Sequence, residues 1–445
     1  MKHDYLLMSE GCSKKLTRDC LPYSIRLSQF LKGILSLLVI AILASCQSSP
    51  SDQESITSGQ FVKVHGVDLI QPNGDKLFIK GTNLGNWLNP EGYMFDFKRT
   101  NAPHRIDQML NEMVGPDFTK YFWQEFKDNY ITFEDIEFIA STGANTIRVP
   151  FHYKLFTNES YMGLNDKNEG FARIDSVVDW CRKTGLYIIL DMHDAPGGQT
   201  GDNIDDSYGY PWLFESESSR QLFFDVWRKI AAYYKDEPVI IAYDLINEPI
   251  APYFDNMDEL NSMLEPLYIE ATAVIREVDQ NHIIMLGAPQ WNSNFKPFSD
   301  STFDENIMYS CHRYGGDSTK EAIQSFIDFR DKVNLPMYMG EIGHNTDEWM
   351  NAFCKIMEEN NIGYTFWPYK KVNGSCFMGI TPPEDWSLVV DFAESPRLTF
   401  EDIREARPDQ KISRQILRTF IENSKFENCQ IQQGYIDALR LADNQ

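Results

Sequence analysis

Residues 132–151, TFEDIEFIASTGANTIRVPF, contain the local pattern on which the fold prediction rests. Thr132 can cap a helix, because its hydroxyl accepts a backbone N–H, and acidic residues follow in the first turn. Gly143 is typical of a residue that ends a helix. NTIRVPF (145–151) then forms an apolar, β-rich run. The stretch therefore predicts a helix followed directly by a buried strand.

The same unit recurs further along the chain. Apolar residues with helical spacing precede Gly185, which is expected to end their helix, and LYIILDMH (186–193) follows as a strand; they are Ile174, Val177, Val178 and Cys181. Eight short apolar runs of this kind are candidate strands: 78–84, 145–151, 186–193, 239–247, 282–288, 307–314, 336–342 and 363–369. Near-continuous apolar character is expected of parallel strands that are buried on both faces.

Eight such strands with helices between them predict a (β/α)8 TIM barrel, whose active site lies at the C-terminal ends of the strands. We expect one catalytic domain over residues 61–445, which includes a C-terminal segment that reads as helix after residue 395. A doubly wound open sheet is the alternative. No G-x-G-x-x-G motif follows the first candidate strand, which disfavours that alternative.

Composition and charge limit the classes of partner. Hydrophobic residues make up 42% and aromatic residues 13% of the chain, which is enough apolar surface for a large core. The formal net charge of −24 argues against nucleic acid as a partner, because nucleic acid is itself negatively charged. A neutral substrate is compatible with this charge, and aromatic rings suit sugars, whose C–H faces stack on them.

The N-terminus has the features of an export signal. Basic residues precede GILSLLVIAILAS (33–45), an apolar run too short to span a bilayer comfortably. The run leads into Cys46 through Leu-Ala-Ser, which resembles the bacterial lipobox. This resemblance implies a signal peptide over 1–45, lipidation of Cys46, a flexible tether over 46–60 and an exported lipoprotein anchored to the cell envelope, at the outer membrane. An ordinary secretory signal is the alternative.

Polar residues cluster where the candidate strands end. Two of them are carboxylates on apolar strands, Glu248 and Glu341, where a charge is costly unless it has a function. The others are Arg148, Asp191, His193, Asn247, His312, Tyr314 and Trp367. Two carboxyl groups at the mouth of a barrel suit glycosidic cleavage, since one can protonate the leaving oxygen while the other attacks the anomeric carbon or activates water.

At this point the chain resembles glycoside hydrolase family 5. LINEPI (245–250) is similar to the acid/base motif of that family, MGEIG (339–343) to its nucleophile motif and TIRVPF (146–151) to its strand-two motif, within a resemblance that covers roughly 75–395. It implies a retaining β-glycosidase that needs no cofactor and no metal. Glu248 would be the acid/base and Glu341 the nucleophile. The implied substrate-binding residues are Arg148, His193, Asn247, His312, Tyr314 and Trp367.

Three segments resemble the exo-β-1,3-glucanase branch of the family: GTNLGNWLNPEG (81–92), DMHDAPGGQTGDN (191–203) and GYTFWPYK (363–370). In that branch, an acid at the position of Glu91 holds the terminal sugar. The chain departs from the branch at Asp194, where glycine is common, and in NIDDSYGYPWLF (203–214). The expected reaction is cleavage of β-glucosidic bonds in an oligosaccharide or polysaccharide, of the exo-β-glucanase or β-glucosidase type.

Three alternatives remain beside this interpretation. One is an endo-acting β-glucanase or β-mannanase of the same family, and another is a surface lipoprotein that binds glycans without cutting them. A metal-dependent barrel hydrolase would use Asp191, His193, His312 and Glu341, but the chain lacks the H-x-H motif that such sites usually show. If Glu248 delivers the proton and Glu341 attacks as a carboxylate, we expect burial and the negative charge of Glu341 to raise the pKa of Glu248.

Overall fold

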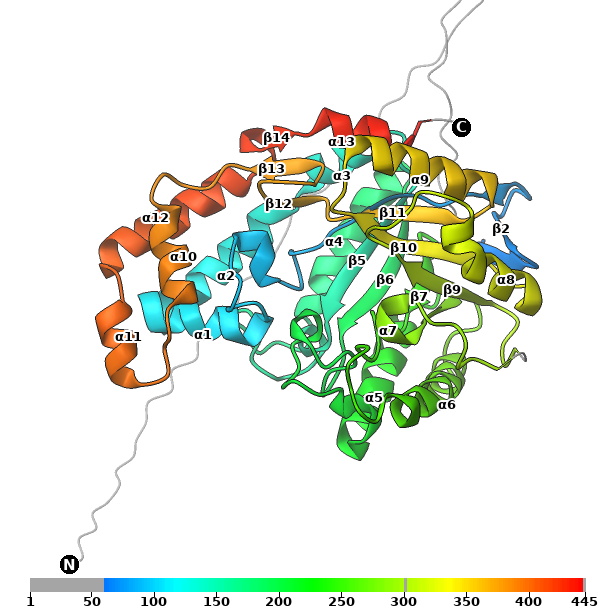
Figure 1. The fold of residues 1–445 in the computed structure, drawn as a ribbon, viewed down its shortest axis with the longest axis horizontal. Coiled ribbons are helices and arrows are strands. Elements are labelled where there is room, and N and C mark those ends of the chain that lie inside the picture. The colour runs from blue at the N-terminus through cyan, green and yellow to red at the C-terminus, as the bar shows by residue number, and fades with distance from the viewer. Residues whose placement is uncertain (1–59, 300–301, 443–445) are drawn as a thin grey trace, which may run out of the picture. The chain divides into compact units, whose positions relative to one another are not determined.

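A computed structural model describes residues 60–299 and 302–442 of the chain (Figure 1). The predicted signal peptide (1–45), Cys46 and all but the last residue of the predicted tether lie outside the described residues. Within the described ranges, none of the helices is both long enough and apolar enough to cross a membrane.

A closed barrel of eight parallel strands forms the centre of the fold, in the order β10-β11-β4-β5-β6-β7-β8-β9. Its strands are β4 (Lys80–Asn83), β5 (Thr146–His152), β6 (Tyr187–Asp194), β7 (Ile240–Asp244), β8 (Ile283–Gly287), β9 (Ile307–His312), β10 (Met337–Gly343) and β11 (Gly363–Trp367). Each of the eight candidate strands of the sequence overlaps one of them, so the predicted (β/α)8 barrel is confirmed. Nearly every strand residue is buried, as their apolar runs predicted.

The fourth strand of the barrel is shorter than predicted. The sequence placed it over 239–247, but β7 ends at Asp244. The chain then leaves the sheet, and Glu248 adopts a left-handed backbone with φ 41°. The catalytic candidate therefore lies on the turn after the strand rather than at its last residue.

Helices surround the barrel, and Figure 1 shows these helices around strands β5 to β11. They include α3 (Phe133–Ser141), α4 (Glu169–Thr184), α5 (Glu217–Tyr234), α6 (Met257–Arg276), α7 (Pro289–Asn292), α8 (Gln324–Val333), α9 (Asp347–Glu359) and α13 (Gln433–Ala438). Thr132 caps α3 in a reciprocal capping box with Asp135, and Gly185 ends α4 in a left-handed conformation. These two predicted helix limits are confirmed.

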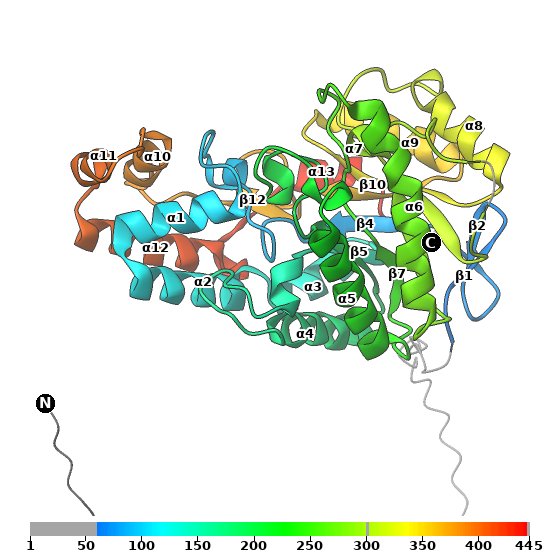
Figure 2. The same ribbon diagram turned by 90° about the horizontal axis from the view of Figure 1, so that it is seen from below.

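A second group of helices packs together beside the barrel (Figure 1, Figure 2). It consists of α1 (Pro103–Val114), α2 (Pro116–Tyr130), α10 (Trp386–Glu394), α11 (Phe400–Ala406) and α12 (Gln410–Ser424). Phe420 on α12 stacks on Trp386 at 4.6 Å and also contacts Phe95. The aromatic stretch after the first barrel strand thus forms two helices that the C-terminal helices cover.

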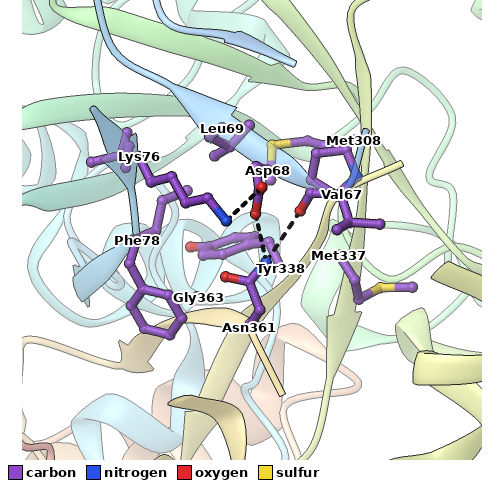
Figure 3. A pocket seen from close by; sticks show the side chains of 13 residues that line it. Val67, Asp68, Leu69, Lys76, Phe78, Met308, Met337, Tyr338, Asn361 and Gly363 are labelled. Atoms are coloured by element: carbon purple, nitrogen blue, oxygen red, sulfur yellow. Dashed lines mark hydrogen bonds and ion pairs between the residues drawn. The ribbon is translucent and has the colours of Figure 1, made fainter. Parts of the chain in front are cut away.

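Two small sheets complete the fold. β12 (Lys370–Val372), β13 (Met378–Ile380) and β14 (Gln430–Ile431) form one sheet, and β1 (Lys63–His65), β2 (Asp68–Ile70) and β3 (Lys76–Leu77) form the other. A cavity of about 90 Å3 lies between this second sheet and the N-terminal ends of the barrel strands, and Figure 3 shows the side chains that line it. Asp68 pairs with Lys76 at 2.6 Å and accepts a hydrogen bond from Asn361. The second sheet therefore covers the end of the barrel opposite to the strand ends where the polar residues cluster.

Candidate active site

A pocket of about 190 Å3 opens at the C-terminal ends of the barrel strands. Seven of the nine predicted catalytic and substrate-binding residues line it: Glu91, His193, Asn247, Glu248, Tyr314, Glu341 and Trp367. The other two, Arg148 and His312, are buried behind the pocket and contact its carboxylates. The remaining lining residues are Tyr93, Ile204 and His344, which the sequence analysis did not identify.

The two catalytic candidates lie close together although they come from different strands. Glu248 follows β7, and Glu341 lies on β10 where the register shifts against β9. Oxygen atoms of the two carboxyl groups and a ring nitrogen of His312 all lie within 4.8 Å of one another. Retaining glycosidases hold their carboxyl groups about 5–5.5 Å apart, whereas inverting enzymes leave about 6.5–9.5 Å for a water molecule. The close spacing suits direct attack by one carboxylate.

The glycine of the MGEIG motif makes this close approach possible. A Cβ atom on Gly340 would lie 2.6 Å from Ser310 Oγ and 2.7 Å from His312 Nε2. Real side chains do not approach so closely, so any larger residue would push β9 and β10 apart. Gly340 thereby leaves room for the His312 ring, which contacts Glu248.

Both carboxylate oxygens of Glu341 accept a hydrogen bond. Arg148 Nη1 donates to Oε1 at 2.8 Å, and the hydroxyl of Tyr314 donates to Oε2. Donors at both oxygens stabilise the ionised form of a carboxylate, which is the form that attacks as a nucleophile.

Arg148 is fully buried inside the barrel and is held by a cluster of acids. Its guanidinium lies 3.0 Å from Asp191 and 2.9 Å from Asp244, besides its contact with Glu341. Burial opposes the charge, but the three carboxylates outweigh burial and raise the pKa of Arg148. Burial also raises the pKa of Asp191 and of Asp244 to about 7, while Arg148 acts in the opposite direction. Asp244 was missed in the sequence, although an acid ending the apolar run IIAYD was a visible signal.

Hydrogen bonds determine the orientation of Asn247 and His193. Asn247 Oδ1 accepts from Arg148 at 2.9 Å, so its amide nitrogen points to His193 Nε2 at 3.1 Å. His193 Nδ1 lies 2.7 Å from Asp191, and burial lowers the pKa of His193 to about 4. A neutral ring that donates from Nδ1 accepts at Nε2. One N–H of Asn247 is therefore left for a ligand in the pocket.

Burial raises the pKa of Glu248 to about 7, and the positive charge of Arg148 acts to lower it. We expected the charge of Glu341 to contribute as well, but burial is the cause that raises this pKa. His312 Nδ1 lies 2.8 Å from Glu248 Oε1, and Asn292 donates to His312 Nε2 at 3.1 Å. Since burial lowers the pKa of His312 to about 3, its neutral ring donates from Nδ1 to Glu248. The second oxygen of Glu248 is then available to carry a proton.

The pocket is also lined by an aromatic pair and a buried acid. Trp367 stacks on His193 with centroids 5.0 Å apart, and its Nε1 donates to Tyr93 Oη at 2.6 Å. Glu91 is buried 3.9 Å from His193, and its Oε1 has no hydrogen-bond partner. Burial raises the pKa of Glu91 well above its usual range, and the charges of Glu341 and Glu248 add to this. An unpartnered polar atom in a pocket is suited to a ligand hydroxyl.

Two acids, Asp205 and Asp206, organise the loop that carries Ile204 into the pocket. Asp205 accepts backbone N–H groups of Thr200, Gly201 and Ser207. The next residue, Asp206, pairs with His104 at 2.6 Å, His152 at 3.0 Å and Lys154 at 3.3 Å. Burial opposes the charge of Asp206, but these partners outweigh burial and lower its pKa. Together the two acids hold the loop that places Ile204 in the pocket.

Asp194, at the end of β6, departs from the exo-β-1,3-glucanase pattern and is fully buried. Neither of its carboxylate oxygens has a hydrogen-bond partner. Burial raises the pKa of Asp194 well above its usual range, and the charges of Asp206, Asp205 and Glu91 act in the same direction. Burial and these neighbouring charges therefore disfavour the ionised form of this side chain.

Among the described residues, Glu248, His312 and Glu341 are the one group of three side chains whose ligand atoms could surround a metal ion. The group does not contain the set Asp191, His193, His312 and Glu341 of the metal-dependent alternative. His193 Nδ1 is already bonded to Asp191, and His312 uses both ring nitrogens for Glu248 and Asn292. That no metal is needed stays a prediction, which chelation tests.

The model of the family described as Cellulase (glycosyl hydrolase family 5) matches residues 110–373. A β-xylosidase of Phanerodontia chrysosporium is 31% identical over 256 residues, which are 57% of this chain and 52% of that protein. The chain thus spans about half the length of that relative.

Two further relatives carry glucan-related names. Endoglucanase C of Acetivibrio thermocellus is 28% identical over 330 residues, which cover 60% of this chain and 92% of that protein. A sporulation-specific glucan 1,3-β-glucosidase of Saccharomyces cerevisiae is 30% identical over 295 residues, which cover 62% of this chain and 63% of that protein.

Solved structures show the same fold at low sequence identity. An endogalactoceramidase superposes with a TM-score of 0.54 at 18% identity, over 70% of this chain and 75% of that one. A rutinosidase from Aspergillus niger gives a TM-score of 0.53 at 22% identity, over 66% and 90%. The family model covers more than half of the chain, and it includes the strands that carry Arg148 and Glu341 and the turn that carries Glu248. The chain is a glycoside hydrolase and belongs to glycosyl hydrolase family 5.

Proposed function

We propose that the chain is a retaining hydrolase of β-glucosidic bonds, of the exo-β-glucanase or β-glucosidase type. The observation that carries this proposal is the pair Glu248 and Glu341, whose carboxyl oxygens lie within 4.8 Å in different environments. Glu341 accepts hydrogen bonds at both oxygens, whereas burial raises the pKa of Glu248 to about 7. One group is suited to attack and the other to deliver a proton.

In the first step, Glu341 attacks the anomeric carbon while Glu248 protonates the glycosidic oxygen that leaves. His312 donates to one oxygen of Glu248, so the other oxygen carries the proton toward the substrate. The free N–H of Asn247 is placed to bond a sugar hydroxyl, which can strengthen as the transition state forms. The product of this step is a glycosyl ester on Glu341.

In the second step, Glu248 is ionised and removes a proton from a water molecule that attacks the ester. The sugar leaves with its original anomeric configuration, and Glu248 regains its proton. Arg148 and Tyr314 stabilise the negative charge that returns to Glu341, because they donate hydrogen bonds to its two oxygens. Neither donor has to move between the steps, which limits the cost of reorganisation.

The size and lining of the pocket support attack at a chain end. Its space of about 190 Å3 is lined in part by Glu91, Tyr93 and Trp367. Trp367 offers a ring face to a sugar, and Glu91 offers an unpartnered oxygen to a hydroxyl. A glucan 1,3-β-glucosidase is among the relatives, which agrees with a glucose-directed pocket.

Product analysis tests this proposal. Wild-type protein and the Glu341→Ala variant would be incubated with an aryl β-glucoside, laminarin, cellulose-derived oligosaccharides and gentio-linked oligosaccharides. We expect the wild type to release glucose with retained β configuration, and the variant to release none. Internal cleavage products would favour an endo-acting glucanase or mannanase, and binding without any product would favour a glycan-binding lipoprotein.

We also propose that the mature protein is a lipoprotein anchored to the cell envelope through Cys46. The apolar run GILSLLVIAILAS (33–45) followed by this cysteine supports the proposal. In a bacterial host, the wild type should fractionate with the outer membrane and incorporate labelled fatty acid. Cys46→Ala should lose the label, and equal labelling of both proteins would contradict the proposal.

A further inference from the structure

We propose that Asn292 is a positioning residue for the proton donor. Its side-chain amide determines which ring nitrogen of His312 carries the proton, and thereby which oxygen of Glu248 can deliver a proton to the substrate. This inference rests on the proposed function, because that function assigns proton delivery to Glu248. Asn292 is fully buried and does not line the pocket, so it acts through His312.

A series of hydrogen bonds leads from the turn at α7 to the pocket. Asn292 Nδ2 lies 3.1 Å from His312 Nε2, and His312 Nδ1 lies 2.8 Å from Glu248 Oε1. Oε2 of Glu341 lies 3.6 Å from the same Nδ1 atom, so two carboxyl groups face this nitrogen. An amide nitrogen therefore faces one side of the ring and carboxyl oxygens face the other.

Glu248 requires a hydrogen-bond donor at its Oε1. In the second step of the proposed reaction this carboxyl group is ionised, and an ionised carboxylate can only accept hydrogen bonds. Burial lowers the pKa of His312 to about 3, so the ring is neutral and carries one proton. His312 can donate to Glu248 only when that proton is on Nδ1. The buried Nε2 then needs a donor of its own, which the NH2 group of Asn292 supplies.

The other tautomer of His312 would be unproductive. With the ring proton on Nε2, the bare Nδ1 would accept the acid proton of Glu248 at Oε1. That proton would point to the ring rather than to the glycosidic oxygen. An oxygen atom in the place of Asn292 Nδ2 would favour this tautomer, because an oxygen of an amide or a carboxylate can only accept from Nε2.

An unusual backbone holds Asn292 in place. Gln290, Trp291 and Asn292 all adopt the left-handed conformation, with φ angles of 53°, 58° and 55°. This conformation is uncommon for residues other than glycine, and a run of three persists only where the surrounding structure requires it. The N–H of Gln290 donates to Ile250 O at 2.9 Å, and the N–H of Asn292 donates to Ala288 O at 3.0 Å. These bonds fix the turn from which the side chain of Asn292 extends.

A glycine gives the amide oxygen of Asn292 its space. A Cβ atom on Gly287, at the end of β8, would lie only 2.4 Å from Asn292 Oδ1. The amide nitrogen of Asn292 faces Ser310 Oγ at 3.5 Å in addition to His312. The close fit of Oδ1 against Gly287 therefore leaves the NH2 group for the histidine ring.

The same arrangement occurs at the other histidine of the pocket. His193 Nδ1 lies 2.7 Å from Asp191, and the amide nitrogen of Asn247 lies 3.1 Å from His193 Nε2. Each of the two rings thus has a carboxyl group at Nδ1 and an asparagine amide at Nε2. Two occurrences in one site indicate that the site selects this tautomer.

Substrates with different leaving groups test the inference. Asn292→Gly removes the amide, and glycine tolerates the left-handed backbone. It should lower kcat/KM about 10-fold for a phenyl β-glucoside, whose departure needs a proton, because loss of one buried hydrogen bond corresponds to roughly a tenfold change. For a dinitrophenyl β-glucoside, whose departure needs no proton, the change should stay below about 2-fold.

Asn334→Gly is the matched control. Asn334 is also left-handed, but it follows α8 and precedes β10, at the end of the barrel opposite to the pocket. This variant should leave kcat/KM unchanged for both glucosides. Equal loss for both substrates in Asn292→Gly would indicate a merely structural role and would overturn the inference, as would loss for neither. The proposed function would stand in both cases.

The position of the ring proton can be measured without any substrate. NMR of protein labelled with isotopic nitrogen in its histidines reports which ring nitrogen is protonated, and His312→Gln identifies the signals of His312. We expect the proton on Nδ1 in the wild type and a proton on Nε2 in Asn292→Asp, because a carboxylate in place of the amide can only accept. A proton on Nε2 in the wild type, or the same protonation in both proteins, would overturn the inference.

Failure of the proposed function has a different signature, which is no turnover of any glucoside by the wild type. The NMR measurement would then still decide whether Asn292 selects the tautomer of His312.

Discussion

Raising the pH above neutrality is expected to stop the first chemical step, because Glu248 loses the proton that it delivers. Burial raises the pKa of this carboxyl from 4.5 to about 7. Such a group is about half protonated at pH 7 and about 1% protonated at pH 9. An exposed carboxyl of ordinary pKa would be only about 0.3% protonated at pH 7. Burial therefore increases the active acid form at neutral pH roughly 150-fold.

The assay is the pH dependence of kcat/KM for a phenyl β-glucoside, whose departure requires a proton. We expect a decline with a midpoint near 7 and a slope of about tenfold per pH unit at higher pH. Glu248→Gln should lack this decline when it is assayed with a dinitrophenyl β-glucoside, whose departure needs no proton. The same decline in the variant, or a wild-type midpoint above about 9, would refute the assignment of Glu248 and its buried environment.

Three further predictions concern residues around the pocket. Tyr314→Phe should lower kcat about 10- to 100-fold with the fold intact, because it removes one donor to Glu341 and keeps the ring against His344. Steady-state kinetics measure kcat and circular dichroism checks the fold. A change in kcat under about threefold would contradict this prediction. Asp206→Ala should lower the free energy of unfolding by about 3–5 kcal/mol, because His152 and the other partners of Asp206 lose a shared buried carboxylate. Guanidinium denaturation measures this free energy, and a decrease below about 1 kcal/mol would contradict the prediction. Prolonged dialysis against a chelator should leave activity unchanged, whereas a loss that a divalent cation restores would favour a metal site at Glu248, His312 and Glu341.

Much of the fold was predictable because a parallel barrel leaves a strong pattern in the sequence. Strands buried on both faces are nearly continuous apolar runs, and all eight candidates overlap a barrel strand. The strand limits were less predictable. β7 stops at Asp244, three residues before its predicted end, because the chain turns to place Glu248 over the pocket. The strands β1 to β3 were missed, since runs of two or three residues show no clear alternation.

The candidate site was predictable where motifs lie on barrel strands or directly follow them. His193, Glu341 and Trp367 lie on strands, and Asn247 and Glu248 follow one, so the barrel itself brings them together. Tyr93, Ile204 and His344 were missed, because they lie on segments whose course depends on contacts with distant parts of the chain. Asp206 illustrates this, since its partners His104 and His152 come from α1 and β5.

By itself, the sequence determined the barrel and the family resemblance and identified the two carboxyl groups as catalytic candidates, because apolar periodicity and local motifs depend on neighbouring residues. Only the tertiary structure decided the surroundings of these two groups. The pKa of Glu248 depends on how deeply packing buries it, and the hydrogen bonds of Glu341 depend on Arg148 and Tyr314 from other strands. Packing brings together residues that lie far apart along the chain, so no local sequence pattern reveals their contacts.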